Sequence, residues 1–253
     1  MNQKIYLICT TPRSGSNLLS SLLESSGMMG QPSEYLNMTG TIPHLAKKHN
    51  LIDVNSTINL EKYLDFIIKN RSSSNNVCGI KIFFNQLERF LDFPEMKEIL
   101  QQCRFVFLTR KDVVAQAVSM YIAKETNIWK STKEDTSSRE LVQYNGFKIG
   151  KIIEDLIKQN TKWSEFFFVN KIDYLEVNYE EIVENANELC QAIASFCGVD
   201  IGDYEFSLGT SRYKKQGDSL NQEFAKIFYD NYRLNLNQQI NSPVLEVNGL
   251  KIV

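Results

Sequence analysis

Groups that suit an anion are concentrated in one short segment near the start of the chain. Residues 11–17, TPRSGSN, separate an apolar run from a leucine-rich stretch and so join a predicted strand to a predicted helix. Gly15 permits a tight turn whose backbone N–H groups face an anion, and the first helical turn adds free N–H donors and a positive dipole end. The side chains that add donors are Arg13, Ser14, Ser16 and Asn17. We therefore predict a site for a phosphate-like group; an ordinary strand-to-helix turn is the alternative.

This loop departs from two common phosphate-binding patterns. Nucleoside triphosphatases need Gly-Lys-Ser/Thr at the end of the loop, but Leu18 stands in the region where the lysine is required. The phosphatase pattern Cys-x5-Arg also fails, because Cys9 is only four positions before Arg13 and lies in a predicted strand. A P-loop-type small-molecule kinase remains an alternative, which Mg²⁺-dependent ATP turnover would support.

A second candidate anion site follows a later apolar run. In LTRKDVVAQAVSMY, Arg110 ends a predicted strand and Ser119 lies on the helix that follows. A guanidinium and a hydroxyl can make charge-assisted hydrogen bonds to a phosphate, each contributing about 1.5–3 kcal/mol. The alternative is a solvated or ion-paired arginine beside an ordinary helix serine. Two anion-binding groups at neighbouring strand ends predict a ligand with two separate phosphate-like groups.

A carboxylate follows the first predicted helix. Glu34, in GQPSEYLN, is the acidic residue that lies nearest after that helix. A carboxylate beside an anion site is unfavourable unless it has a task, such as accepting a proton from a hydroxyl nucleophile. Glu34 is therefore a candidate general base; a surface glutamate in a turn is the alternative.

Predicted strands alternate with predicted helices along the chain. The strands are expected at 4–10, 76–84, 103–110 and 173–183, and the helices at 16–27, 57–70, 93–102, 111–125, 141–168 and 187–198. This alternation predicts an α/β fold with a parallel sheet flanked by helices on both faces. Ligands of such sheets bind beyond the carboxyl ends of the strands, where the candidate residues fall.

The organisation of the chain predicts one domain over residues 1–253, with a helix and a hairpin as its tail from about residue 219. Asn248-Gly249 between alternating runs is a strong hairpin signal, and a two-residue loop would place Glu246 opposite Lys251. Because an isolated hairpin is marginally stable in water, we expect it to pack on the domain or on a partner subunit.

Composition narrows the class of protein. The chain is 43% hydrophobic and 23% charged, and its formal net charge of -2 argues against a nucleic-acid binder. We expect a cytoplasmic protein, since neither a signal peptide nor a membrane-spanning run is apparent. The five cysteines form no CxxC pair and are expected to be reduced thiols. With two histidines, the chain offers no obvious metal cluster.

Five segments, in this order, resemble a known family. They are TPRSGSNLL, GQPSEYLN, GIKIFFNQ, LTRKDVVAQAVSMYIAKETNIWK and VNYEEIV, and they span roughly residues 4–183. Together they resemble the bacterial carbohydrate sulfotransferases of the trehalose 2-sulfotransferase type, which use 3′-phosphoadenosine 5′-phosphosulfate (PAPS). The resemblance implies a P-loop-like sulfotransferase fold, a carbohydrate or glycolipid acceptor and no metal. It is compatible with a homodimer, and with membrane contact only where the acceptor is a lipid.

The resemblance also implies roles for individual residues. Glu34 falls where this family carries its general base, whereas the animal cytosolic sulfotransferases use a histidine that GIKIFFNQ lacks. Arg110 and Ser119, nine positions apart, match the pair that holds the 3′-phosphate. The 5′-phosphosulfate loop would consist of Arg13, Ser14, Gly15, Ser16 and Asn17, with Arg13 also stabilising charge during transfer. The late segment YKKQGD is weakly similar to a basic segment that completes the 3′-phosphate site, through Lys215 and Gln216.

These residues do not identify the acceptor molecule. Trp129 matches an aromatic residue near the family's acceptor cleft, although a packing role is equally consistent, and His44 is the substitute base if Glu34 is not used. The segments 38–55 and 131–140 are the expected cleft walls. A non-catalytic nucleotide-binding or glycan-binding protein on the same scaffold is the remaining alternative, which the joint presence of Arg13, Glu34 and Arg110 disfavours.

Overall fold

The computed structural model describes residues 3–129, 141–211, 219–240, 245–247 and 250–252. Contacts divide the chain into two compact units, residues 1–113 with 154–215 and residues 114–153 with 216–253. The predicted single-domain organisation stays a prediction, because a division by contacts does not show whether either unit folds alone. Among the described residues, no helix combines the length and the apolar character that crossing a membrane would require.

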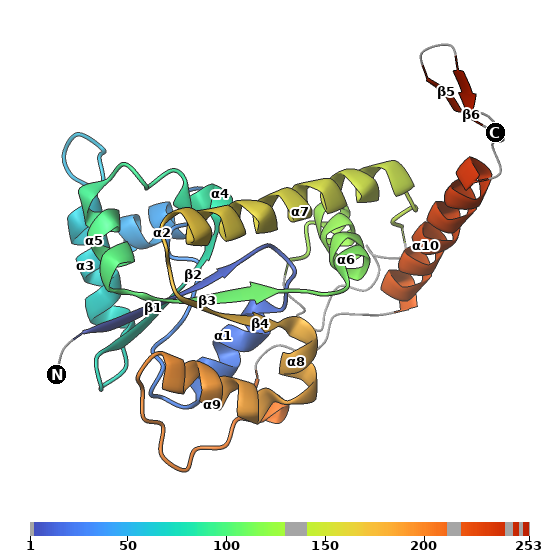
Figure 1. The fold of residues 1–253 in the computed structure, drawn as a ribbon. Helices are drawn as coiled ribbons and strands as arrows, with labels where there is room; N and C mark the ends of the chain where they lie inside the picture. Colours follow the sequence, from blue (N-terminus) through green and yellow to red (C-terminus); the bar gives the residue numbers. More distant parts are fainter. Residues whose placement is uncertain (1–2, 130–140, 212–218, 241–244, 248–249, 253) are drawn as a thin grey trace. The chain divides into compact units, whose positions relative to one another are not determined.

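The first unit is built on a four-stranded sheet in which all strands are parallel (Figure 1). The strand order is β2-β1-β3-β4, with β1 at Lys4–Thr10, β2 at Val77–Phe83, β3 at Arg104–Thr109 and β4 at Tyr174–Asn178. Thr10 pairs with Phe83 on one side and Leu108 on the other. The carboxyl ends of the three strands therefore meet at one edge, where ligands bind in open parallel sheets.

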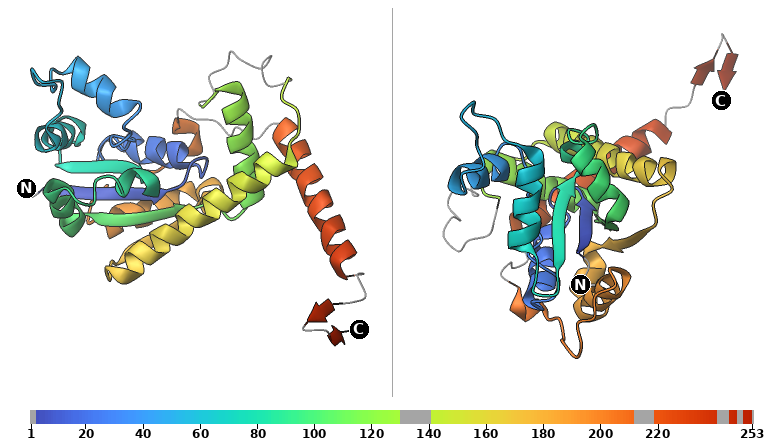
Figure 2. Two further views of the ribbon diagram at one scale, coloured as in Figure 1. Left: turned by 90° about the horizontal axis from the view of Figure 1, so that it is seen from above. Right: turned by 90° about the vertical axis from the view of Figure 1, so that its left-hand side faces the viewer.

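Helices cover both faces of this sheet, as predicted (Figure 2). One face carries α1 (Ser16–Ser25), α8 (Tyr179–Glu184) and α9 (Ala186–Phe196). The other carries α3 (Leu60–Arg71), α5 (Pro94–Gln102) and the part of α7 (Gly146–Val169) that begins at residue 154.

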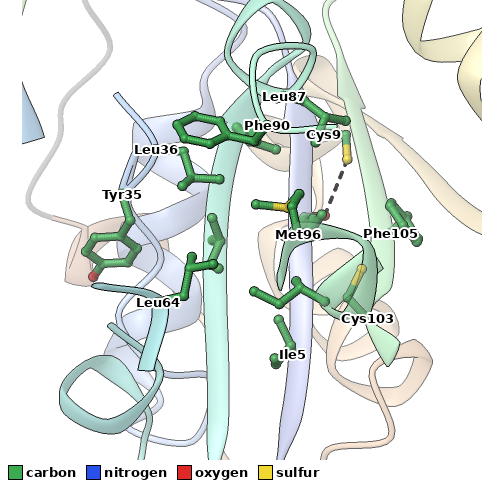
Figure 3. Close-up of a cluster of buried hydrophobic side chains, with 14 of the residues drawn as sticks. Ile5, Cys9, Tyr35, Leu36, Leu64, Leu87, Phe90, Met96, Cys103 and Phe105 are labelled. Carbon is green, nitrogen blue, oxygen red and sulfur yellow. Dashed lines mark hydrogen bonds between the residues drawn. The ribbon is translucent and has the colours of Figure 1, made fainter. Parts of the chain in front are cut away.

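The alternation of side chains along β1 divides the core into two clusters. Ile5, Leu7 and Cys9 pack toward α3 and α5, in the cluster that Figure 3 shows, while Tyr6 and Ile8 pack toward α1 and α9. All five side chains are buried. Burying an aliphatic side chain contributes roughly 1.5–3 kcal/mol, so the apolar run that predicted this strand also supplies the centre of the core.

An indole hydrogen bond connects α7 to the end of β1. Trp163 is fully buried, and its Nε1–H donates to the carbonyl of Thr10 at 3.1 Å. The Phe167 ring stacks on the indole with a centroid separation of 5.5 Å. Thr10, the residue directly before the candidate anion loop, is therefore held by a helix on the face of the sheet opposite to α1.

The second unit contains most of α6 (Val113–Thr126), the first part of α7 and α10 (Ser219–Ile240). The Phe224 ring of α10 lies against the rings of Tyr121 and Tyr144. The hydroxyl of Tyr121 donates to the carbonyl of Gln143 at 2.6 Å. Aromatic packing and this hydrogen bond tie α6, α10 and the segment directly before α7 together.

The predicted hairpin is confirmed. β5 (Leu245–Val247) pairs antiparallel with β6 (Leu250–Ile252), and Glu246 lies opposite Lys251. The turn residues 248–249 lie outside the described residues. The packing of the hairpin on the domain or on a partner subunit stays a prediction.

Two predicted boundaries are wrong, and capping explains both. The long helix starts at Gly146, not near residue 141, because Asn145 Oδ1 accepts a hydrogen bond from the backbone N–H of Lys148 and acts as the N-cap. The fourth strand ends at Asn178, not at residue 183. The Asn178 and Glu181 side chains form a reciprocal capping box that starts α8.

Besides α8, two further short α-helices among the described residues were not predicted. α2 (Thr41–Lys48) lies in the segment expected to line the acceptor cleft, and α4 (Phe84–Leu87) directly follows β2. Gly40 precedes α2 without a side-chain cap, so the local sequence signal for the start of this helix is weak. Leu45 and Ala46 are buried against the domain, which supplies the missing stabilisation.

Candidate active site

The candidate anion loop has the backbone shape of an anion nest. Arg13 has φ of 65° and Gly15 has φ of 84°, so two residues of the loop adopt the left-handed region around Ser14. Alternation of this kind turns successive N–H groups toward one side. A left-handed arginine costs on the order of 1–2 kcal/mol, and it persists only where the surrounding structure determines it.

Hydroxyl groups fix the start of this loop. Thr10 Oγ1 lies 2.6 Å from Ser14 Oγ and donates to the carbonyl of Leu108 at 2.7 Å. Both Thr10 and Ser14 are fully buried. The bond to Leu108 crosses from β1 to β3, so the loop is attached to the sheet and not only to its own strand.

Gly15 is required by close packing as well as by conformation. A Cβ atom at this position would lie 2.3 Å from Cδ2 of Tyr179, the first residue of α8. Its φ of 84° is in addition unfavourable for any L side chain. The ring of Tyr179 therefore packs directly against Gly15 in the loop.

The same tyrosine ring supports Arg110. The Arg110 guanidinium carbon lies 4.7 Å from the centroid of the Tyr179 ring, and Nη1 donates to the carbonyl of Arg13 at 3.3 Å. Arg110 Nε is buried, and within the described part of the chain it has no hydrogen-bond partner. A cationic group with an unused buried N–H donor is thus held beside the loop, and the two predicted anion-binding groups lie at neighbouring strand ends.

A carboxylate from α8 organises the turn after Arg110. Glu180 accepts hydrogen bonds from the backbone N–H groups of Lys111 at 3.1 Å and Asp112 at 3.4 Å. Tyr179 and Glu180 are adjacent, so α8 positions both the loop and the arginine. Neither received a role from the sequence, although both lie in the segment VNYEEIV that carries the family resemblance.

Glu34 lies on a segment that is fastened along β2. Ser33 forms an isolated parallel bridge with Ile80, and the Lys81 N–H donates to the Ser33 carbonyl at 2.9 Å. The Tyr63 hydroxyl, from α3, donates to the Tyr35 carbonyl at 2.7 Å. Residues on both sides of Glu34 are therefore held by tertiary hydrogen bonds, and its side chain remains 25% exposed.

Lys81 brings Glu34 and the anion loop together. Its Nζ lies 2.9 Å from Glu34 Oε1 and donates to Asn17 Oδ1 at 2.5 Å, while its side chain is only 4% exposed. A buried ammonium must be paired, and two of its partners here, Glu34 and Asn17, come from two different predicted site segments. The sequence reasoning missed this residue; the available signal was one lysine inside the otherwise apolar run VCGIKIF.

Cys9 is not a nucleophile beside this loop. Burial raises the pKa of its thiol well above the ordinary value, and burial likewise raises the pKa of Cys78 and Cys190 to about 12. A protonated buried thiol is unreactive, which agrees with the rejection of a phosphatase pattern.

The comparison with protein families assigns the class of the chain. Residues 5–231 match the Stf0 sulphotransferase family. The chain belongs to this family. It is a sulfotransferase, and the enzyme class expected from the resemblance is confirmed.

Relatives and a solved structure agree with this assignment. Proteins named trehalose 2-sulfotransferase from Mycobacterium tuberculosis and Mycolicibacterium smegmatis are each 26% identical over 226 residues, covering 77% of this chain and 84% of the relative. The sulfotransferase domain from the curacin biosynthetic pathway has a TM-score of 0.51 at 14% identity, covering 90% of this chain and 98% of that one. The latter likeness concerns the fold alone, and it confirms the predicted sulfotransferase fold.

The contacts described above do not join the other predicted site residues of this sulfotransferase to the anion loop. Ser119 lies on α6 in the second unit, so its pairing with Arg110 stays a prediction. Lys215 and Gln216 lie outside the described residues, as does the predicted loop 131–140. Trp129 is 43% exposed and donates from Nε1 to Asn127 Oδ1. His44 is exposed on α2.

Proposed function

We propose that this sulfotransferase moves the sulfuryl group of PAPS to a hydroxyl group of a carbohydrate or glycolipid, with Glu34 as the general base. The position of Glu34 carries the proposal, because Lys81 ties its carboxylate to Asn17 at the end of the anion loop. A base must lie within hydrogen-bond reach of the hydroxyl it deprotonates, and that hydroxyl must be near the transferred group. A carboxylate tied to the donor loop meets both requirements.

The groups at the carboxyl ends of β1 and β3 suit a donor that carries two anionic ends. The backbone of Arg13 and Gly15 opens N–H groups toward one anion, and Arg110 keeps a buried Nε–H without a partner among the described residues. We assign the 5′-phosphosulfate to residues 13–17 and the 3′-phosphate to Arg110, with Ser119, Lys215 and Gln216 as further ligands of the 3′-phosphate. When bound, PAPS supplies the sulfuryl group. No metal ion takes part in this proposal.

Glu34 would remove the proton of the acceptor hydroxyl. Its two carboxylate oxygens are held differently, since Oε1 lies 2.9 Å from Lys81 Nζ and Oε2 lies 3.4 Å from the amide nitrogen of Asn37. The more loosely held Oε2 is the atom that would receive the proton. Arg13 and the loop N–H groups would stabilise negative charge on the donor as the acceptor oxygen attacks.

The acceptor class rests on the relatives. Both carry the name trehalose 2-sulfotransferase, which supports a sugar hydroxyl as the acceptor and makes trehalose the first compound to test. Glycolipids are the second class, and contact with a membrane surface is proposed only for that case. A homodimer remains part of the proposal, to be measured by the mass of the protein in solution.

Transfer of labelled sulfate is the direct test. The purified protein is incubated with PAPS and a panel that contains trehalose, other disaccharides and glycolipids, and products are read by mass spectrometry. We expect a mass increase of one sulfate on a carbohydrate, at a hydroxyl position. Absence of transfer to every sugar and glycolipid in the panel would contradict the proposal.

Donor binding separates this proposal from a kinase. A saturating concentration of 3′,5′-adenosine bisphosphate, about 100 times its Kd, should stabilise the protein by roughly 2.7 kcal/mol in thermal unfolding. ATP with Mg²⁺ should stabilise it less and should not be hydrolysed. Mg²⁺-dependent ATP turnover would instead support the kinase alternative.

A further inference from the structure

One charged side chain is buried in the centre of an otherwise apolar strand. Lys81 lies on β2 between Ile80 and Ile82, both of which belong to the core cluster on the α3 and α5 face. It pairs in register with Ile8, which packs on the α1 face. Lys81 therefore points toward α1, and its ammonium reaches the first turn of that helix.

Stability alone is a weak explanation for this lysine. Removing an ammonium from water costs several kcal/mol, and well-packed apolar residues in place of a buried ion pair are often neutral or stabilising. Two acceptors of the Lys81 ammonium, Asn17 and Glu34, belong to the predicted active site. Asn17 is 64 residues away in the chain and lies at the start of α1, whereas Glu34 lies on the segment fastened along β2.

We propose that Lys81 is the positioning residue for Glu34, and that it transmits the placement of the donor loop to the base. The bond to Oε1 turns Oε2 toward the acceptor, and the bond to Asn17 sets the distance between base and loop. This inference rests on the proposed function, because it takes Glu34 as the base. It assigns Lys81 to the orientation of the base and not to contact with the acceptor.

The charge of Lys81 suits this position throughout the reaction. Before transfer, the ammonium balances the ionised Glu34 carboxylate at 2.9 Å. When Glu34 accepts a proton, the carboxylate becomes neutral, and the ammonium remains beside Asn17 and the anion loop. The same ammonium therefore lies beside the Glu34 carboxylate before proton transfer and beside the anion loop after it. Because Lys81 is buried, little water screens its charge.

A double-mutant cycle tests the inference. Lys81→Met removes the ammonium with little change in volume, and it is combined with Glu34→Gln. We expect Lys81→Met to lower kcat about 10- to 100-fold, the size of effect that a misplaced catalytic group produces, with the KM for PAPS changed less than about 3-fold. In the Glu34→Gln background the same change should lower kcat less than about 3-fold further, because the residue it positions is already inactive.

The matched control is Lys162→Met. Lys162 pairs with Glu88 at 3.0 Å in the same unit, so the same substitution again removes an ion pair, here a more exposed one, and neither residue belongs to the predicted site. We expect its kcat to equal that of the wild type.

The outcomes separate this inference from the proposed function. Full turnover in Glu34→Gln would remove Glu34 as the base and with it the proposed mechanism. A large loss in Glu34→Gln together with full turnover in Lys81→Met, or with fully additive losses, would overturn only the role of Lys81.

A crystal structure of Lys81→Met is the second measurement and does not depend on the acceptor. We expect the Glu34 carboxylate to leave its place near Asn17. A carboxylate that keeps its position would overturn the inference. If Lys81→Met does not fold, Asn17→Ala removes the other half of the bridge, and the same cycle and structure apply to it.

Discussion

The anion loop and the Glu34 segment meet at Lys81 but are held in different ways. The loop is held by its own backbone, by the Thr10 and Ser14 hydroxyls and by the Tyr179 ring under Gly15. The Glu34 segment is held by a backbone bridge between Ser33 and β2, and its carboxylate and neighbouring residues are held by long-range side-chain contacts, from Lys81 on β2 and Tyr63 on α3. The difference indicates that donor binding depends mainly on backbone shape, whereas placement of the base depends on a few side chains. Substitutions in the two regions should therefore affect different measurements.

The largest effect is expected from Glu34→Gln. It should lower turnover about 10²–10⁴-fold, because the acceptor hydroxyl loses its general base, and it should leave the affinity for 3′,5′-adenosine bisphosphate unchanged. Steady-state kinetics measures the turnover, and calorimetry measures the affinity for the nucleotide. Glu88→Gln, which breaks the ion pair with Lys162, is the matched control and should keep full turnover. A loss of nucleotide affinity in Glu34→Gln would break the division between the two regions.

Arg110→Ala should lower the affinity for 3′,5′-adenosine bisphosphate about 10- to 150-fold, the equivalent of one charge-assisted contact worth about 1.5–3 kcal/mol. The affinity for adenosine 5′-phosphosulfate, which lacks the 3′-phosphate, should not change. Arg104→Ala, at the opposite end of the same strand, is the control. Equal losses for both nucleotides would mean that Arg110 acts through its bond to the Arg13 carbonyl instead.

Gly15→Ala tests the backbone half of the comparison. The new Cβ would meet Tyr179 and would occupy a φ of 84°, so the loop must rearrange. Strain on the order of 1–3 kcal/mol predicts a nucleotide affinity about 5- to 150-fold lower, measured by calorimetry.

Gly150→Ala is the matched control for this change, since it lies in α7 with no atom within 4 Å of the added Cβ and without a positive φ. It should bind the nucleotide as the wild type does. Normal nucleotide binding by Gly15→Ala would show that the loop does not use its backbone conformation.

The smallest effect is expected from Tyr63→Phe, which tests the side-chain contacts that hold the Glu34 segment. Loss of the hydroxyl leaves the Tyr35 carbonyl without its donor and should lower the free energy of unfolding by about 1 kcal/mol in denaturant titration. Turnover should fall less than about 10-fold, with nucleotide affinity unchanged. Tyr174→Phe is the control, because its hydroxyl makes no hydrogen bond within the described residues and its ring stacks on Phe167. Equal destabilisation by both substitutions would contradict a specific role for Tyr63.

Much of the fold could be read from local patterns. The four strands, their parallel arrangement and the helices on both faces follow from short apolar runs that alternate with amphipathic stretches. The hairpin register follows from Asn-Gly between alternating residues. The start of α7 and the end of β4 were misplaced, because Asn145 and Asn178 act as helix caps that the apolar pattern does not reveal.

The candidate site was only partly readable. The loop and Arg110 could be proposed as a site because each follows directly on a strand, and the fold brings the ends of these neighbouring parallel strands together. Lys81 was missed because its signal is one charge in an apolar run, which by itself does not say which carboxylate it meets. α2 was missed because burial of Leu45 and Ala46, and not propensity, stabilises it.

The sequence alone therefore determined most of the elements, the candidate anion loop as a strand-to-helix turn, and the resemblance to the sulfotransferase family, since these depend on short segments of the chain. Tertiary structure alone decided that Tyr179 supports both Gly15 and Arg110, and that Lys81 joins Asn17 to Glu34. These contacts join residues far apart in the chain, and the packing of a parallel sheet sets their distances. A buried ammonium needs partners, but only the fold determines which partners are within its reach.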